Sequence, residues 1–345
     1  MRRSFHALLG AAIVGGFVSV GAAAAPQADA RSEHQRVVDF WTMDRVRQAV
    51  PRDFVRDPAS GRFVPAKPGN GNRPPGGGGG DSTTVTGASW TSGGVVVDTT
   101  GKVLFELGTD ADGDPQFWVC SASVVTESAT GRSLVLTAAH CAYENEGSGE
   151  FAKNWVFIPN YDASPAALDT ALSFCDATEY GCWVASALVV HDGFASAGGF
   201  NGTAILHDFA FAVTGNGGHN GELLVESLGT QNIMFTDVAR GTAVHDFGYP
   251  HAAPYDGTDL VYCAGGVNFD NRLFKLTYKL DCDMTGGSSG GPWGTEFADG
   301  SGTLMSVNSD RYSSGGGIYG PKFNSTTQAV YTGALSTNKD TVVSG

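Results

Sequence analysis

Short hydrophobic runs separated by Gly, Asp and Ser turns dominate the chain from about residue 95 onward. The runs are rich in Val, Phe, Thr, Trp and Tyr, and no long stretch with the 3.6-residue period of a helix competes with them. This pattern predicts an all-β fold, a barrel or a sandwich, and about 250 residues suffice for two small barrels. Expected strands include 103–105, 117–119, 155–158, 183–190, 208–213, 244–249, 273–278 and 304–307.

A different pattern precedes this body. Arg2 and Arg3 are followed by an apolar, Gly/Ala-rich run, which is typical of an export signal peptide over residues 1–25, with cleavage as late as residue 30. A single membrane anchor is the alternative, but the run is short and too rich in Gly to suit a bilayer. We therefore expect a protein that is secreted to the extracellular space.

Between the signal and the body lie a basic segment, 31–64, and a Pro/Gly-rich linker, 65–94, which should be flexible. Within the basic segment, Thr42 is placed to cap a short helix that ends before Pro51. This organisation predicts a removable pro-segment, and the alternative is an unstructured spacer.

Charge divides unevenly along the chain. Residues 1–90 hold 11 basic and 7 acidic residues, a net +4, whereas residues 91–345 hold 10 and 28, a net −18, which together reproduce the −14 of the whole chain. The acidic body argues against nucleic acid and against anionic membranes as partners. The basic segment should be attracted to the acidic body with a strength that depends on salt.

Six cysteines form an even set, as expected of an exported protein, and allow 15 pairings. We expect Cys120–Cys141 to tie two neighbouring strand-like runs, Cys175–Cys182 to staple one loop, and the remaining pair to form Cys263–Cys282. A metal site is the alternative reading. Because the chain has no Cys-x-x-Cys and no Cys/His cluster with ligand spacing, we expect no metal and no cofactor.

Two motifs carry candidate chemistry. The serine in Gly-Ser-Ser-Gly-Gly-Pro (287–292), Ser289, sits where a tight turn exposes a hydroxyl and aims backbone N–H groups at one spot. Upstream, His140 lies in Thr-Ala-Ala-His-Cys after an apolar run and is a candidate base for that nucleophile.

A histidine base needs a carboxylate to orient it, and three His-Asp pairs offer one. Asp192 is followed by Gly-Phe and indicates a turn, while Asp246 lies in a strand-like run that ends at Gly-Tyr-Pro. Asp208 opens the run Phe-Ala-Phe-Ala-Val, where a buried acid would need a polar partner such as an imidazole. We therefore select Asp208.

These three motifs, in the order His, Asp, Ser, resemble the chymotrypsin-like serine peptidases, and the likeness runs from about residue 101 to 309. Gly-Lys-Val at 101–103, Gly-Tyr-Pro at 248–250 and Thr-Gly-Gly at 285–287 resemble the secreted bacterial glutamyl endopeptidase branch. The resemblance implies two six-stranded antiparallel β-barrels, 95–215 and 216–345, with the active site in the cleft between them. It also implies an oxyanion hole from Gly287 and Ser289, and Ser309 as support for the aspartate.

The chain departs from these relatives around the expected substrate pocket. Ser288 stands where trypsin-like zymogens carry an aspartate before the nucleophile, so that activation switch is absent. Asn308 occupies the position of the glutamyl enzymes' histidine, and Met284 that of their Thr or Ser. Asp283 lies at the offset of the trypsin pocket carboxylate, which would favour Arg or Lys in the substrate. The alternative is that Asp283 faces solvent.

The sequence thus predicts a monomeric, secreted serine endopeptidase made as a zymogen, with protein or peptide substrates and its own pro-segment as partners, and with no nucleic acid and, after processing, no membrane partner. Two alternatives are a protease-like β-barrel binding protein without catalysis and an esterase with the same triad. The intact set of Ser289, His140 and Asp208 disfavours the first. The motif order and the lack of strand–helix alternation disfavour the second.

Overall fold

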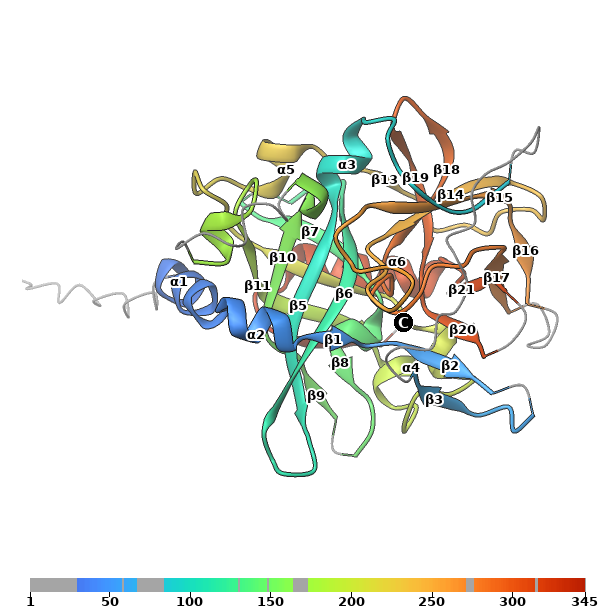
Figure 1. The fold of residues 1–345 in the computed structure, drawn as a ribbon, viewed down its shortest axis with the longest axis horizontal. Helices are drawn as coiled ribbons and strands as arrows, with labels where there is room; N and C mark the ends of the chain where they lie inside the picture. Colours follow the sequence, from blue (N-terminus) through green and yellow to red (C-terminus); the bar gives the residue numbers. More distant parts are fainter. Residues whose placement is uncertain are drawn as a thin grey trace, which may run out of the picture.

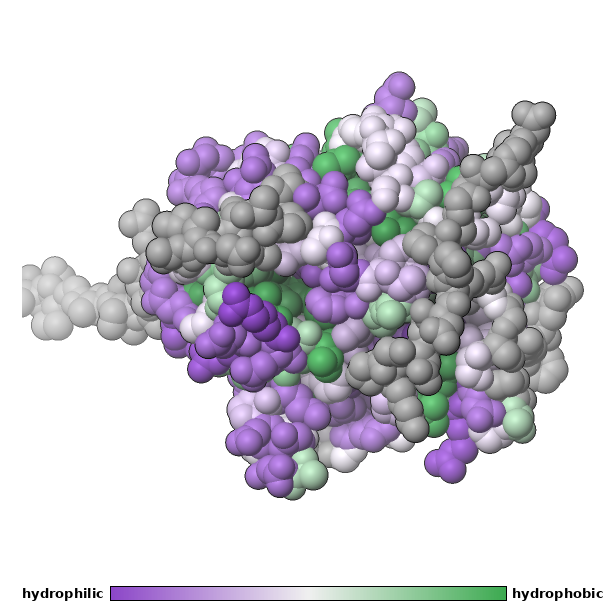
Figure 2. Space-filling model, in the orientation of Figure 1, coloured by the Kyte–Doolittle hydropathy of each residue, from purple (hydrophilic) through white to green (hydrophobic). Residues whose placement is uncertain are grey.

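The computed structural model describes residues 30–57, 59–66, 84–129, 131–147, 149–163, 173–270, 276–313 and 316–344. Two β units lie side by side, with short helices around their edges (Figure 1). The face in Figure 2 is mostly hydrophilic, and its hydrophobic patches are small and scattered. The expected export signal and residues 67–83 of the expected linker lie outside the described residues. Within those residues, no helix has the length and apolar character needed to span a membrane.

The first unit is a closed barrel of six antiparallel strands. The order is β6–β5–β10–β11–β12–β7, and β7 pairs back with β6 to close the barrel. Fully buried side chains such as Phe105, Leu136, Phe157 and Phe211 fill it. The strands are β5 (Thr100–Thr109), β6 (Pro115–Val125), β7 (Ser133–Thr137), β10 (Lys153–Pro159), β11 (Trp183–His191) and β12 (Ala210–Thr214).

The second unit combines two sheets around one core that contains Tyr278, Trp293 and Met305. One sheet has the order β13 (Asn232–Ile233), β19 (Ser301–Val307), β18 (Pro292–Ala298), β14 (Ala243–Gly248), β15 (Val261–Gly266), β4 (Val85–Ser89). The other has the order β16 (Asn268–Phe269), β17 (Thr277–Leu280), β21 (Ile318–Pro321), β20 (Asp310–Tyr312), β2 (Phe54–Arg56), β3 (Phe63–Pro65). The all-β fold predicted from the strand pattern is confirmed, and so is the two-barrel architecture implied by the family resemblance.

The expected boundaries need two corrections. Residues 85–89 of the expected linker form β4, an edge strand of the second barrel, because they pair with β15 and the following Trp90 packs edge-on against Phe247, Tyr262 and Phe297. The C-terminus returns to the first barrel, where α6 (Ser325–Ser336) packs on β11 and β12, and β22 (Thr341–Val343) extends β11 in parallel. Both segments bury apolar side chains that a separate linker or tail would leave exposed.

Residues 30–66, which we call the leader, fold onto the body. Thr42 caps α2 (Met43–Gln48) by accepting a hydrogen bond from the Arg45 backbone N–H, as the sequence predicts. Trp41 is buried, and its indole N–H donates to the Asn154 carbonyl at 2.7 Å. In Figure 1 the leader (blue) runs from the first barrel to the second. Its α1 (Ala30–Phe40) contacts β10 and β11, and β1 (Val50–Pro51) pairs in parallel with β6.

The remaining short elements decorate the barrels: α3 (Val95–Thr99), α4 (Asp192–Ala195), α5 (Leu224–Leu228), β8 (Tyr143–Glu144) and β9 (Glu150–Phe151). Three disulfides, the same pairs as expected, join Cys120 to Cys141, Cys175 to Cys182 and Cys263 to Cys282. Each closes a short loop and adds roughly 2–4 kcal/mol to stability. The first joins β6 to the turn that carries His140, and therefore fixes that turn on the barrel.

Asp246, one of the aspartates not selected from the sequence, is completely buried on β14 beside the Cys263–Cys282 disulfide. Burial raises the pKa of this carboxyl well above its usual range, so the acid loses its proton at a higher pH in the folded protein than in the unfolded chain. As the pH rises from the pKa of Asp246 in the unfolded chain to its pKa in the folded protein, each unit lowers the free energy of unfolding by about 1.4 kcal/mol.

The variant Asp246→Asn keeps the shape of the neutral acid and is expected to unfold at a higher temperature than the parent at pH 7. The buried acid lowers the stability of the parent only above the pKa of the carboxyl in the unfolded chain, about 3.9. The difference in unfolding temperature between the two proteins should therefore shrink toward pH 4. Thermal unfolding of both proteins at pH 4, 5.5 and 7 measures it. A gap that is constant with pH would show that Asp246 is ionised in the folded protein.

Candidate active site

His140 and Asp208 meet at the edge of the first barrel. His140 lies in a single turn of 3-10 helix, Ala139–Cys141, directly after β7, and Asp208 precedes β12, the strand that pairs with β7. The Asp208 carboxylate lies 2.8 Å from His140 Nδ1 and accepts the His140 backbone N–H at 2.9 Å. The Ser309 hydroxyl donates to the same carboxylate at 2.6 Å. Three donors thus satisfy a fully buried carboxylate, which holds the imidazole in one orientation.

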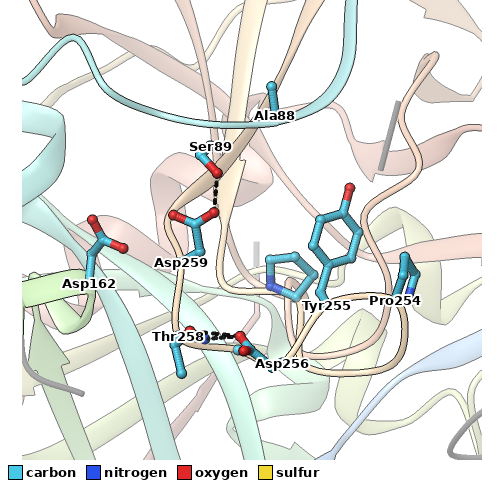
Figure 3. A pocket seen from close by; sticks show the side chains of 10 residues that line it. Ala88, Ser89, Asp162, Pro254, Tyr255, Asp256, Thr258 and Asp259 are labelled. Atoms are coloured by element: carbon cyan, nitrogen blue, oxygen red, sulfur yellow. Dashed lines mark hydrogen bonds between the residues drawn. The ribbon is translucent and has the colours of Figure 1, made fainter. Parts of the chain in front are cut away.

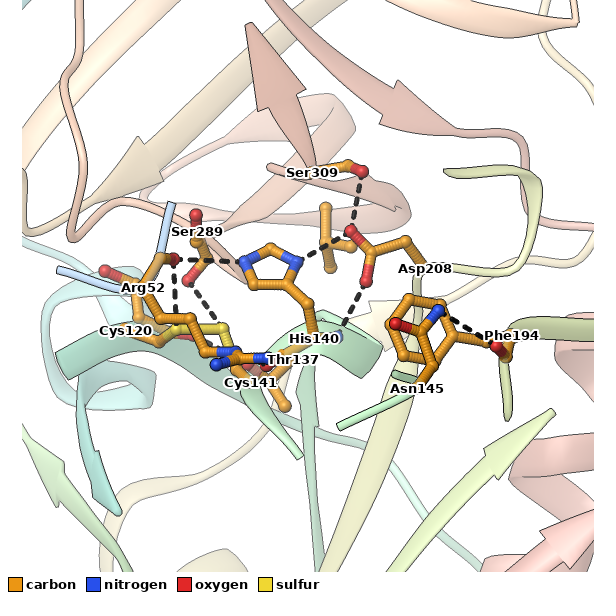
Figure 4. A network of polar contacts seen from close by, with 12 residues as sticks. Arg52, Cys120, Thr137, His140, Cys141, Asn145, Phe194, Asp208, Ser289 and Ser309 are labelled. Atoms are coloured by element: carbon orange, nitrogen blue, oxygen red, sulfur yellow. Dashed lines mark hydrogen bonds and ion pairs between the residues drawn. A yellow bond between two sulfur atoms is a disulfide. The ribbon is translucent and has the colours of Figure 1, made fainter. Parts of the chain in front are cut away.

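Ser289 reaches this pair from the second barrel, and Figure 4 shows Ser289, His140 and Asp208 in a row. Its turn is tightly packed: Gly290 has φ +81°, and a Cβ there would lie 2.1 Å from Thr137 Oγ1. The Ser289 carbonyl accepts the Ser121 N–H of β6 at 2.7 Å. These contacts tie the turn to the first barrel and explain why glycine follows the serine.

The backbone before Ser289 is fixed as well. Gly287 has φ +103°, and a Cβ there would lie 2.7 Å from the His251 backbone nitrogen, so only glycine fits. The Ser121 hydroxyl donates to the Gly287 carbonyl at 2.8 Å and fixes that peptide. The N–H groups of Gly287 and Ser289 are the donors expected for an oxyanion, and they belong to the same fixed turn.

Residues of the leader cover His140 and Ser289. The carbonyl oxygen of Arg52 lies 3.2 Å from His140 Nε2, the atom that would receive a serine proton. The Arg52 guanidinium donates to the His140 carbonyl at 2.7 Å and to Glu144 at 2.8 Å. Phe54 stacks on Phe200 with 4.0 Å between ring centroids, and both rings meet the His140 imidazole edge-on. As a result His140 is 1% exposed and Ser289 is 4% exposed.

Next to Ser289 lies a small depression, which we call the hollow, lined by Ser288, Ser289, Ser309, Asp310, Arg311 and, from the leader, Asp53. Asp53 accepts two hydrogen bonds from the Arg311 guanidinium, from Nε at 2.9 Å and from Nη2 at 2.6 Å. Burial raises the pKa of Asp310 well above its usual range, and the nearby Asp208, Asp270 and Asp53 carboxylates add to this effect. This shift favours the uncharged form of Asp310 beside the Asp53–Arg311 ion pair.

Comparison with solved structures gives close matches. The protease Anisep from Arthrobacter nicotinovorans is 35% identical, with 73% of this chain and all of that chain covered at a TM-score of 0.58. The serine protease AL20 from an extremophilic microorganism is 33% identical, with 70% of this chain and 99% of that chain covered at a TM-score of 0.56. A Glu endopeptidase, 16% identical over 73% of this chain and 97% of its own at a TM-score of 0.52, shares the fold.

The chain belongs to the chymotrypsin-like serine proteases. It is a serine endopeptidase, as the sequence predicts. No protein-family model matches the chain, and no curated protein matches it by sequence.

The three positions considered for the protease's substrate pocket lie in different surroundings. Met284 is buried in the core of the second barrel. Asp283 accepts a hydrogen bond from the Tyr255 hydroxyl at 2.6 Å, and its backbone N–H donates to Thr86 of β4 at 2.8 Å. Neither residue lines the hollow beside Ser289. Asn308 does line it, but its side chain is held by the Trp293 indole N–H at 2.6 Å and by the Ser288 carbonyl at 3.1 Å.

A second pocket, of about 500 Å³, lies beside Tyr255 (Figure 3). It is acidic, with Asp162, Asp256 and Asp259 in its wall, and Asp259 accepts a hydrogen bond from Ser89 of β4. None of its lining residues belongs to the candidate triad. The smaller hollow, in contrast, is lined by the candidate nucleophile Ser289.

The structure also shows residues of the site that the sequence did not reveal. Arg311 stands two positions after Ser309. Once Ser309 had been matched to the family serine, this spacing alone would have placed Arg311 near the site. Phe200, in contrast, follows two glycines in a loop and carries no motif that marks it. Two groups that combine His140 or Asp246 with cysteines have ligand-like spacing among the described residues, but their cysteines are in disulfides.

Proposed function

We propose that the protease is a secreted endopeptidase in which Ser289 is the nucleophile, His140 the general base and Asp208 the orienting carboxylate. The observation that carries this proposal is the Asp208 carboxylate, which binds His140 Nδ1, the His140 N–H and the Ser309 hydroxyl at once. An aspartate held in this way keeps the Nδ1 proton in place and leaves Nε2 free to accept a proton.

In the proposed reaction the Ser289 oxygen attacks the carbonyl carbon of a substrate peptide while His140 Nε2 takes the hydroxyl proton. The carbonyl oxygen becomes an oxyanion that accepts hydrogen bonds from the N–H groups of Gly287 and Ser289. Collapse breaks the C–N bond, the amine leaves with the proton from His140, and Ser289 holds the acyl group. Water then attacks the ester, giving its proton to His140, and Ser289 leaves with that proton. Asp208 stabilises the imidazolium in both halves.

We further propose that the leader is an inhibitory pro-segment and that the full-length chain is a zymogen. The Arg52 carbonyl occupies the position at His140 Nε2 that the serine hydroxyl needs, and Phe54 covers the imidazole. Anisep is matched over its whole length by 73% of this chain, which leaves about a quarter of this chain without a counterpart. Residues 1–94 make up a share of similar size.

The fold supports a narrower range for the proposed cut. The sequence predicts removal of residues up to a point between Arg73 and Gly101, and the pairing of β4 with β15 narrows that range, because a cut after Val85 would strip an edge strand from the second barrel. We expect the cut before Val85. The signal peptide, 1–25, would be removed on export, and the three disulfides suit an extracellular location.

Expression of the full-length chain in a secreting host tests these statements together. The culture medium should contain a protein that cleaves denatured protein substrates and whose N-terminus, by sequencing, lies between residues 74 and 85. The same chain with Ser289→Ala should be secreted but remain unable to cleave them. A fully active protein that still begins near residue 31 would refute the inhibitory leader, and equal cleavage by the Ser289→Ala protein would refute the triad.

A further inference from the structure

We propose that Arg311 is the residue that selects the substrate: it binds an acidic side chain, Asp or Glu, on the acyl side of the bond that is cut. The proposal rests on the proposed function of Ser289. It starts from Asp53 of the leader, whose buried carboxylate is held by two N–H groups of Arg311. Asp53 therefore shows that Arg311, in the wall of the hollow beside Ser289, can hold a carboxylate.

Asp53 lies close to the residues of the proposed reaction. It lines the hollow together with Ser289, and a Cβ added to Gly286 would lie 3.0 Å from the Asp53 Cβ. The preceding residue, Arg52, places its carbonyl oxygen 3.2 Å from His140 Nε2. The acid that Arg311 holds in this structure thus directly follows the residue whose carbonyl lies against the proposed base.

The backbone of Arg311 is fixed beside the hollow, where its guanidinium can bind a substrate side chain. It lies on β20, two residues after Ser309, whose hydroxyl is bound to Asp208 and whose N–H donates to the Tyr319 carbonyl at 2.9 Å. β20 also pairs with β21, a strand of the body, so its path does not depend on the leader alone. When the leader departs, the Arg311 guanidinium remains beside Ser289 and loses the Asp53 carboxylate.

Charge in the hollow favours an acid over other side chains. Apart from Asp53 and Asp310, the lining side chains are Arg311 and uncharged residues such as Thr285, Asn308 and Ile318. Asp310 is buried, and burial raises the pKa of its carboxyl, which favours the uncharged acid over a carboxylate that would compete for Arg311. A carboxylate would form charge-assisted hydrogen bonds with the guanidinium, a basic side chain would be repelled, and an apolar one would leave a half-buried cation without a partner.

A selecting role for Arg311 differs from both positions that the sequence suggested for substrate recognition, Asp283 and Asn308. The Asp283 carboxylate, which would have favoured basic substrates, is bound to Tyr255 outside the hollow. Asn308 stands where the glutamyl enzymes carry histidine, and its amide is bound to the backbone of the nucleophile turn and to Trp293. Arg311 is then the remaining candidate in the hollow for recognition of a carboxylate.

The test uses the secreted, processed enzyme and a peptide library of mixed sequence, with cleavage sites read by mass spectrometry. Matched peptides with Glu, Gln, Asp or Asn before the cut then give kcat/KM. We expect Glu and Asp to exceed their amides by roughly 30-fold or more, and Arg311→Gln to reduce that ratio to about threefold or less, with little change for the amides. Arg311→Lys should retain part of the ratio. The control Arg240→Gln, on the exposed side of the same barrel, should leave it unchanged.

A second readout is the chain's own processing. In residues 67–84, Asp81 is the one acidic residue, so an acid-selective enzyme that processes itself should produce a chain that begins at Ser82. Asp81→Asn should block this cut and Arg73→Gln should not. Titration with a fluorophosphonate normalises every rate to the amount of folded enzyme, so a misfolded variant is not mistaken for a selective one.

The outcomes separate the two proposals. Cleavage that requires Ser289 but shows no preference for acids, or an Arg311→Gln enzyme that loses all substrates equally, overturns the role of Arg311 and leaves the triad standing. No cleavage of any library peptide, together with no labelling of Ser289, overturns the proposed function itself.

Discussion

Replacement of Ser289 by alanine is expected to lower kcat on peptide substrates by roughly 10⁴-fold or more, while the substrate KM changes little. The reason is chemical, since the variant has no oxygen to form the acyl-enzyme and His140 has no proton to take. The oxyanion donors and the substrate hollow would remain, so binding should survive. Steady-state kinetics on the processed enzyme, with protein folding checked by thermal unfolding, measures the effect.

Ser288 offers a matched control one residue away. It is also buried, and its hydroxyl donates to the Thr285 carbonyl at 2.9 Å within the same turn. Ser288→Ala should therefore keep activity within about tenfold of the parent, because it removes one neutral hydrogen bond of roughly 1 kcal/mol and no reacting atom. If the Ser288 and Ser289 variants lost activity to the same extent, the loss would reflect damage to the turn.

Release of the leader is expected to raise the activity of the full-length chain by about 100-fold or more. A tethered segment has an effective concentration near millimolar, so even micromolar affinity would leave only about 0.1% of the sites open. The contacts support such affinity: Phe54 stacks on Phe200, Arg52 binds Glu144, and Asp53 binds Arg311. A cut in residues 67–83 alone would not release a segment held by these contacts.

The experiment follows activity after such a cut. Activity should appear slowly on dilution and should fall again when a peptide of residues 30–66 is added in trans. A peptide with Phe54→Ala and Asp53→Asn should inhibit at least about tenfold less well, because it lacks the stacked ring and the charge pair. Full activity at once, with no response to the added peptide, would show that the leader does not block the site.

The sequence located the motifs of the site because each is local. His140, Asp208 and Ser289 each sit in a short frame whose neighbours explain them: an apolar strand before His140, a buried strand after Asp208, and glycines around Ser289. The fold brings these frames together through the β7–β12 pairing and the contact of the Ser289 turn with β6. Several strands of both barrels were likewise readable from apolar runs, among them β5, β11, β14 and β19, whereas β4, β15 and β18 were not among those expected.

The course of the leader was not readable because its pairings are long-range and parallel. Val50 pairs with Trp118, and Phe54 pairs with Asp310, at sequence separations that no local pattern records. A basic composition predicted attraction to an acidic body, but direction and register depend on specific contacts such as Asp53 with Arg311. For the same reason sequence offset drew attention to Asp283, whereas the packing of Tyr255 and β4 decides where its carboxylate lies.

The most direct test of the account is the site of reaction with a fluorophosphonate. The processed enzyme is incubated with the reagent, digested and mapped by mass spectrometry, alongside the Ser289→Ala protein and the uncut full-length chain. The account predicts one phosphonylated residue, Ser289, with no adduct in the variant and slow labelling in the full-length chain. An adduct on a different residue, or a processed protein that cleaves peptides yet takes no label, would contradict it.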